Sequence, residues 1–196
     1  MANRIPTAMD IIEEYAVLIP LVQANGQWKV IFELRSMNLN TQPGEISFPG
    51  GQVEEGESHK EAAIRETLEE LNIEEKCIEV LGELDYLISH SNISIHCFVG
   101  IISDVNLGNI LPNPDEVDHI FTVPLEYFIE NEPKEYSLDL ETKYNSEFPY
   151  NLIPNGKDYK FRNIVNRIYF YEYEDYIIWG YTAKMMKNFI DIVRDL

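Results

Sequence analysis

GQVEEGESHKEAAIRETLEELNI, residues 51–73, contains a helix whose two ends can both be recognised. Ser58 and Glu61 form the S-x-x-E pattern of a capping box, which places the N-cap of the helix at Ser58. Asn72 follows where a helix closes with a left-handed residue, a conformation that asparagine adopts more readily than other non-glycine residues. The sequence therefore predicts a helix over residues 59–71.

Three carboxylates, Glu66, Glu69 and Glu70, occupy positions i, i+3 and i+4 of this helix, so their side chains gather on one side. A solvated acidic face is the ordinary explanation of such a pattern in an acidic chain. Like charges at this spacing cost about 0.2–0.5 kcal/mol per pair, and a hard cation would remove that cost. Mg²⁺ suits the position because it takes one or two carboxylates and completes its shell with water and phosphate oxygens.

The helix also carries apolar residues, which predict how it packs. At ~100° per residue, Ile64, Leu68 and Leu71 point roughly opposite to the glutamates. We therefore expect this apolar side to face the body of the protein and the acidic side to face a cleft. Ala62 and Ala63 flank the acidic side, where their small side chains leave room for a loop or a ligand.

The same segment resembles the Nudix box, G-x5-E-x7-R-E-U-x-E-E-x-G-U, in which U is a bulky apolar residue. The matching positions are Gly51, Glu57, Arg65, Glu66, Glu69, Glu70 and Ile73. Thr67 replaces an apolar residue and Asn72 replaces the last glycine, and neither change touches the charged set.

The resemblance implies a role for each charged position of the box. Glu66 and Glu70 would be the principal metal ligands, and Glu69 would be a further ligand or would activate water. Gly51 would offer its backbone carbonyl to a metal. Arg65 and Glu57 would form a pair that orients the ligands.

A longer resemblance, to the coenzyme A pyrophosphatase branch of the Nudix enzymes, covers most of the chain from about residue 15. Residues 32–51, FELRSMNLNTQPGEISFPGG, are similar to its R-S-x3-R-x3-G-x3-F-P-G-G signature, and residues 112–128 and 177–186 to its C-terminal part. The branch implies substrate contacts by four residues: Arg35, Ser36, Gly50 and Gly51. For Arg35, an ordinary surface arginine whose guanidinium group is solvated is an equally good interpretation. Asn40 and Gln42 stand where an arginine and a histidine are usual, which leaves substrate identity open.

These features predict a Mg²⁺- or Mn²⁺-dependent hydrolase that splits coenzyme A, or a derivative, into adenosine 3′,5′-bisphosphate and 4′-phosphopantetheine. Glu116 lies at a loop-to-strand junction and is the candidate general base, although it would equally be a surface glutamate. ADP-ribose or a dinucleotide polyphosphate is an alternative substrate. A catalytically silent nucleotide-binding module is the alternative from another class, and the complete acidic set of the box argues against it.

Bulk composition limits the partners of this chain. It has 196 residues, 45% of them hydrophobic, which suits one domain over residues 1–196 with a substantial core. The net charge of −19 argues against nucleic acid and anionic membranes as partners, because both select a basic surface. It also repels a polyphosphate, so metals and a few basic residues must reverse the field at the site.

The remaining signals concern redox state and location. Cys77 and Cys97 are too few to stabilise a fold of this size by disulfides, so we expect reduced thiols. Residues 1–15 lack the apolar core of a secretory signal, and no run of 18 apolar residues occurs. A cytoplasmic location is therefore expected by default.

The rest of the chain reads as alternating strands and short helices. Asn-Gly at residues 25–26 predicts a hairpin between strands at 17–22 and 29–34. Further strands are predicted at 46–48, 78–88 with a break near Gly82, 93–102 and 116–123, a hairpin at 168–179 that turns at 174–175, and helices at 125–130 and 181–193. Residues 131–161 are interpreted as an irregular insertion or lid.

Together these elements predict an α+β protein with an α/β/α sandwich around a mixed central sheet, the architecture that a Nudix resemblance also implies. Aromatic residues are abundant near the C-terminus, in the run IYFYEYEDYIIW at residues 168–179. They would either bury a homodimer contact or fill the core.

Overall fold

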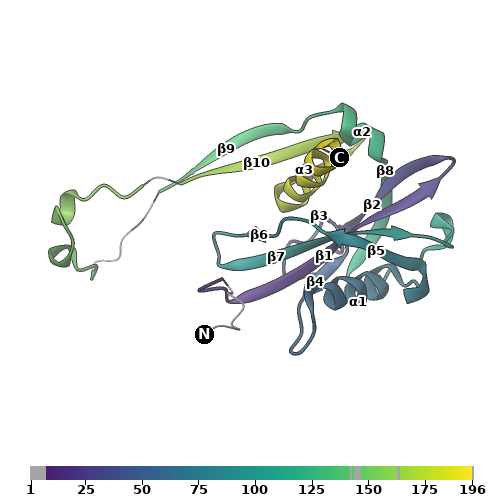
Figure 1. Cartoon of the computed structure of the whole chain (residues 1–196), viewed down its shortest axis with the longest axis horizontal. Coiled ribbons are helices and arrows are strands. Elements are labelled where there is room, and N and C mark those ends of the chain that lie inside the picture. Colours follow the sequence, from purple (N-terminus) through teal and green to yellow (C-terminus); the bar gives the residue numbers. More distant parts are fainter. Residues whose placement is uncertain (1–7, 142, 144–146, 163, 196) are drawn as a thin grey trace.

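The computed structural model describes residues 8–141, 143, 147–162 and 164–195. Within these ranges, α1 lies on one face of a large sheet and α3 on the other (Figure 1). In chain order the elements are β1 (Glu13–Ala24), β2 (Gln27–Arg35), β3 (Ile46–Ser47), β4 (Gly50–Gln52), α1 (His59–Leu71), η1 (Glu75–Cys77), β5 (Ile78–Glu83), β6 (Leu87–Ile88), β7 (Ile93–Ile102), η2 (Leu107–Asn109), β8 (Val117–Pro124), α2 (Leu125–Glu130), β9 (Lys134–Leu140), η3 (Tyr150–Leu152), η4 (Gly156–Asp158), β10 (Ile164–Tyr173), β11 (Tyr176–Trp179) and α3 (Gly180–Asp195).

The central sheet is mixed, which confirms the predicted α+β sandwich. Its main path runs β3-β2-β1-β7-β5, with β4 on β1, β6 on β7 and β8 on β2. β1 and β7 run parallel, whereas the other pairs are antiparallel. The predicted hairpin is confirmed, since Asn25 and Gly26 have φ of 54° and 77° and so form the left-handed turn that suits the strand twist.

Alternating side chains of β2 pack on the two opposite faces of the sheet. Val30 and Phe32 pack into the core beneath α3, where the Phe32 ring stacks on that of Phe48 with centroids 5.0 Å apart. Ile31 points the other way and packs with Leu71 of α1. The next residue on that side is Glu33, so a carboxylate enters the space beneath α1.

Both ends of α1 are as predicted. The Ser58 side chain and Glu61 form the capping box, and Asn72 closes the helix with φ 52° and ψ 50°. The predicted packing face is correct for Leu71, which is buried, but wrong for Ile64 and Leu68, which are only half-buried. The rest of the inward face consists of Ala62, Ala63, Thr67 and Glu70. The small residues let α1 approach the sheet closely, so Glu70 faces the protein while Glu69 stays exposed.

Residues 131–161 are not irregular throughout, which corrects the prediction. Residues 134–140 form β9, which pairs antiparallel with β10 in a second, three-stranded sheet of order β11-β10-β9. Apolar residues at 136, 138 and 140 alternate with polar ones, a period of two that neighbouring charges obscured. Figure 1 shows the β9–β10 ribbon reaching away from the large sheet. Parts of the range, residues 142 and 144–146, lie outside the described residues; the lid role and the single-domain assignment stay predictions.

The C-terminal elements match their predictions. The β10–β11 hairpin turns at Glu174, with φ 51°, and α3 follows directly. The Thr182 hydroxyl of α3 donates to the Ile46 carbonyl at 3.0 Å and so ties the helix to β3.

Cys77 and Cys97 are both buried free thiols, as expected. In the described part of the chain, no helix combines the length and apolarity that crossing a bilayer requires.

Candidate active site

Strand β4, which begins with Gly50 and Gly51, pairs with β1 and lies against α1. The Gly50 N–H donates to Oε2 of Glu70 at 2.8 Å. A Cβ at Gly50 would lie 2.4 Å from the Ala16 carbonyl oxygen and 2.6 Å from Cα of Val17, distances that real Cβ atoms do not reach. Glycine is therefore required here, and the backbone of β4 can lie directly against the carboxylates of α1.

Gly51 is in contact with the first box carboxylate. A Cβ at this position would lie 2.2 Å from Oε1 of Glu66 and 2.3 Å from its Cδ. The Glu66 carboxylate therefore fills the space that a side chain at residue 51 would take. This brings Gly51 and Glu66 together, as the predicted site requires.

Gly51→Ala is expected to weaken divalent-metal binding about tenfold, within the 10–100-fold range for disturbed support of a ligand. The added methyl would push the Glu66 carboxylate aside without disturbing the backbone, because a flexible side chain can move. Isothermal titration calorimetry with Mn²⁺ measures the affinity. Gly82→Ala is the matched control, since a Cβ there meets nothing within 4 Å. Equal Mn²⁺ affinity in both variants would contradict the assignment of Glu66.

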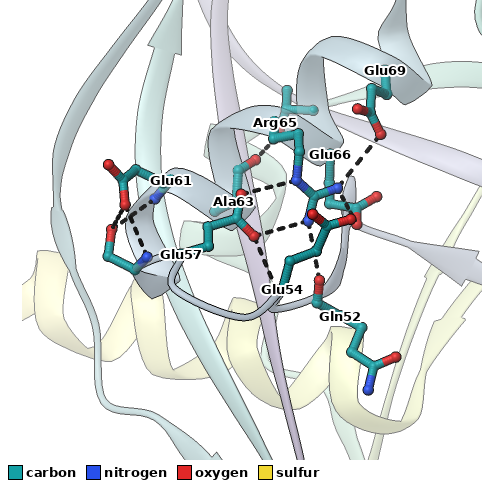
Figure 2. A network of polar contacts seen from close by, with 10 residues as sticks. Gln52, Glu54, Glu57, Glu61, Ala63, Arg65, Glu66 and Glu69 are labelled. Atoms are coloured by element: carbon teal, nitrogen blue, oxygen red, sulfur yellow. Dashed lines mark hydrogen bonds and ion pairs between the residues drawn. The ribbon is translucent and has the colours of Figure 1, made fainter.

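Arg65 is the centre of an ion-pair network that holds the acidic face in place (Figure 2). Its Nε and Nη2 donate to the two carboxylate oxygens of Glu57 at 2.9 and 3.0 Å, a bidentate pair. Its Nη1 donates to Oε1 of Glu66 at 2.8 Å, and its Nη2 to the Gln52 carbonyl at 3.1 Å. These hydrogen bonds raise the pKa of Arg65 and lower the pKa of Glu57. The predicted orienting pair is present and reaches Glu66.

Two buried carboxylates face each other beneath α1. Glu70 is 3% exposed and Glu33 is fully buried. Burial raises the pKa of both groups, and the charge of Glu33 raises the pKa of Glu70 further. Ser47 donates to Oε1 of Glu33 at 2.9 Å, whereas Oε2 of Glu33 is buried without a partner among the described residues. Unpaired buried acceptors are costly, which makes this spot a candidate functional site.

Glu33 is a site residue that the sequence reasoning missed. The available signal was a lone carboxylate among the apolar residues of the strand run Val30–Leu34. It went unrecognised because Glu33 and the box helix are far apart in sequence. The charges of Glu116 and Glu66 also raise the pKa of Glu33, so all these acidic groups share one region.

The other predicted residues lie at the rim. Glu116 is half-buried immediately before β8, and its charge raises the pKa of Glu66 and Glu70. Arg35 ends β2, where its charge lowers the pKa of Glu33 and its buried Nε finds no acceptor in the described ranges. Ser36 is buried and its N–H donates to the Glu116 carbonyl at 2.8 Å, which suits a structural role in the loop.

A divalent cation needs several oxygen donors that lie close together. Within residues 8–141, 143, 147–162 and 164–195, no three acidic, histidine or cysteine side chains converge closely enough to form a ready-made cage. Glu69 lies outermost, with its side chain 57% exposed and 3.5 Å from Nη1 of Arg65. The chemistry nevertheless fits, because crowded carboxylates with raised pKa values and an unpartnered oxygen are the hard oxygen donors that such cations select.

The buried carboxylates predict a pH-dependent stability for the metal-free protein. Burial raises the pKa of Glu33 to about 7 and that of Glu70 to about 9, from 4.5 in the unfolded chain. The folded protein then binds more protons than the unfolded chain within this window, so stability should fall as pH rises from 5 to 9. Urea unfolding in EDTA measures it. Glu70→Gln should flatten the dependence, and a stability that rises over this range would contradict the assignment.

Comparison with known proteins places these features in a family context. The NUDIX domain family matches residues 13–141. Nudix hydrolase 3 of Caenorhabditis elegans is 32% identical over 181 residues, which cover 91% of this chain and 72% of that protein. The peroxisomal coenzyme A diphosphatase NUDT7 of Mus musculus is 29% identical over 179 residues, which cover 88% of this chain and 66% of that protein.

Two further findings concern the length of the chain relative to its relatives and the similarity of its fold to a solved structure. The chain spans only about half, 55% and 52%, of two plant relatives that it matches. The crystal structure of a MutT/nudix family protein from Enterococcus faecalis aligns with a TM-score of 0.53 over 98% of this chain and 66% of that chain. Its sequence is 14% identical, so this likeness supports the fold alone.

Proposed function

Because this chain belongs to the Nudix hydrolase family, enzymes that cleave phosphoanhydride bonds, we propose that it hydrolyses the diphosphate of coenzyme A or a derivative with Mg²⁺ or Mn²⁺. The observation that carries the reaction class is the contact of Glu66 and Glu70 with the Gly50–Gly51 backbone. The substrate rests on the signature at residues 32–51 and on the likeness to the mouse coenzyme A diphosphatase. Divalent metal ions are general in the family; the choice of Mg²⁺ or Mn²⁺ is part of the proposal.

Glu66, Glu70 and the Gly51 carbonyl would hold the metal, with Glu33 and Glu69 as further donors. A divalent cation bound there would neutralise diphosphate charge and lower the pKa of a coordinated water. Arg65, fixed by Glu57, keeps the Glu66 carboxylate beside Gly51. The side chains therefore hold the ligand oxygens in position before substrate arrives, which is how orientation contributes to rate.

Two residues at the rim would act on the substrate itself. Arg35 has a buried Nε–H without an acceptor in the described residues, and a phosphate oxygen would satisfy it. Glu116 would accept the proton of the attacking water on its carboxylate, since it lies in the region where its charge acts on Glu66 and Glu70. Ser36 and the glycine backbone would shape the surface that receives the diphosphate.

The decisive experiment identifies both the compound that is cleaved and the phosphorus atom that water attacks. The protein with Mg²⁺ is incubated in ¹⁸O-labelled water with coenzyme A, ADP-ribose or a dinucleotide polyphosphate, and products are identified by mass spectrometry. We expect adenosine 3′,5′-bisphosphate and 4′-phosphopantetheine, with label in one of them. Faster cleavage of another compound would favour the alternative specificity suggested by Asn40 and Gln42. Tight nucleotide binding by calorimetry without any product would favour the silent module.

Several expectations about partners and location stay predictions. A homodimer, the exclusion of nucleic acid and membranes, and a cytoplasmic location are expectations from the sequence. The mouse relative is named as peroxisomal, so relatives do not share one compartment.

A further inference from the structure

A crevice lies between the end of β2, the segment before β3, and the β10–β11 hairpin. Its volume is about 540 Å³, within the range of about 300–1,000 Å³ that small-molecule sites occupy. It is lined by Leu34, Gly44, Glu45, Ile46, Phe170, Asp175, Tyr176, Ile177 and Trp179. None of the carboxylates of the candidate active site lines it.

The crevice and the carboxylates lie on opposite faces of the sheet but at the same end of β2. Leu34 packs with the core beneath α3, whereas its neighbour Arg35 lies beside Glu33 on the α1 face. β3 shows the same alternation, because Ile46 lines the crevice and Ser47 donates to Glu33. At Glu33 and Leu34, β2 pairs with β3 on one side and with β8 on the other, so the sheet itself separates the two sites there. The Gly44 N–H donates to the Arg35 carbonyl and closes the turn that joins β2 to β3, and a long substrate would occupy both sites by bending around this turn.

The walls of the crevice are apolar and aromatic. The rings of Phe170 and Trp179 are nearly parallel, 13° apart, with centroids separated by 5.9 Å. Tyr176 stacks on Phe121 at 3.6 Å and is thereby fixed in place. Ile177 and Trp179 are 47% and 41% exposed, so apolar surface remains open to a ligand.

The charges that line the crevice determine which part of a ligand can bind there. Glu45 and Asp175 line the crevice, and no lysine or arginine among the described residues does so. A phosphate group would meet two carboxylates without a counter-charge, at an energetic cost. A neutral chain with methyl groups, amides and a hydroxyl would instead pack against the rings and donate hydrogen bonds to the carboxylates.

We propose that this crevice binds the neutral pantetheine arm of the substrate, while the diphosphate lies at the carboxylates on the opposite face. The inference rests on the proposed function, because coenzyme A is the substrate class that joins a diphosphate to such an arm. It assigns a specificity role to Trp179, Ile177 and Phe170. The 3′-phosphorylated adenosine end is then directed away from the crevice.

Binding can be tested without turnover. The chain has two tryptophans, and Trp28 lies in the β1–β2 hairpin, so Trp28→Phe leaves Trp179 as the only tryptophan reporter. In EDTA, we expect free pantetheine to change the emission of Trp179 in a saturable manner, and adenosine 3′,5′-bisphosphate to leave it unchanged. No response to pantetheine at millimolar concentration, or a response to the nucleotide alone, would overturn the proposal.

Steady-state kinetics supplies the second measurement. Ile177→Glu adds a third carboxylate to the crevice and is expected to raise KM for coenzyme A about tenfold with kcat unchanged, as does the loss of binding that the ground state and the transition state share equally. Ile88→Glu is the matched control, an isoleucine of β6 with similar exposure, 53% against 47%. Equal KM values in the two variants would overturn the proposal. If the wild-type protein does not cleave coenzyme A, the proposed function fails, and the pantetheine titration still decides the crevice.

Discussion

Glu70→Gln is expected to lower metal-dependent hydrolysis by at least about 10²-fold, because loss of a metal ligand should exceed the 10–100-fold effect of losing an outer partner. The amide oxygen can still accept the Gly50 N–H, so the loop and α1 should remain in contact. The amide also resembles the protonated acid that burial favours at neutral pH, so unfolding by urea at pH 7 should change little. What is lost is the negative charge that a cation requires.

The measurement combines activity over a metal titration with circular dichroism. Glu75→Gln, an exposed glutamate in η1, is the matched control and should keep wild-type rates. Unchanged activity of Glu70→Gln with a native spectrum would remove the box carboxylates from the mechanism.

Glu116→Gln is expected to slow turnover by ~10²–10⁴-fold with substrate binding preserved, the usual effect of removing a general base. The residue precedes β8 and its carbonyl accepts the Ser36 N–H, contacts that the amide variant retains. Its charge acts on both Glu66 and Glu70, so it lies in the same region as the box carboxylates.

A pH–rate profile separates a base from a structural residue. The acidic limb of the wild-type profile, to which Glu33 and Glu70 also contribute, should change shape in Glu116→Gln if this carboxylate accepts the proton. Asp115→Asn changes the neighbouring exposed carboxylate and should leave the profile intact. An unchanged rate and profile in Glu116→Gln would assign the residue to structure.

Features encoded by local interactions were predicted well. The capping box at Ser58 and the left-handed Asn72 fix the ends of α1, and Asn25–Gly26 fixes the β1–β2 hairpin, because each involves residues close in sequence. Periodicity predicted correctly that Leu71 packs, but it did not predict that Glu70 turns inward while Ile64 and Leu68 stay half-buried. That outcome depends on how closely Ala62 and Ala63 let the helix approach the sheet, which is a tertiary property.

The parts that were missed depend on distant segments. β9 becomes a strand because β10, more than twenty residues later, pairs with it. Glu33 belongs to the site because β2 passes beneath α1, which no local pattern records. The box predicted Glu66, Glu70, Arg65 and Gly51 as neighbours, and their contacts bear this out, whereas their catalytic roles stay predictions.

The raised pKa values of Glu33 and Glu70 imply that cation uptake and deprotonation are one event. At neutral pH the metal-free protein retains hydrogen ions on these acids, and a ligated carboxylate cannot keep them. Loading the site should therefore acidify a weakly buffered solution. In calorimetry, the apparent binding enthalpy should shift with the ionisation enthalpy of the chosen buffer, and a buffer-independent enthalpy would show that the acids were already ionised.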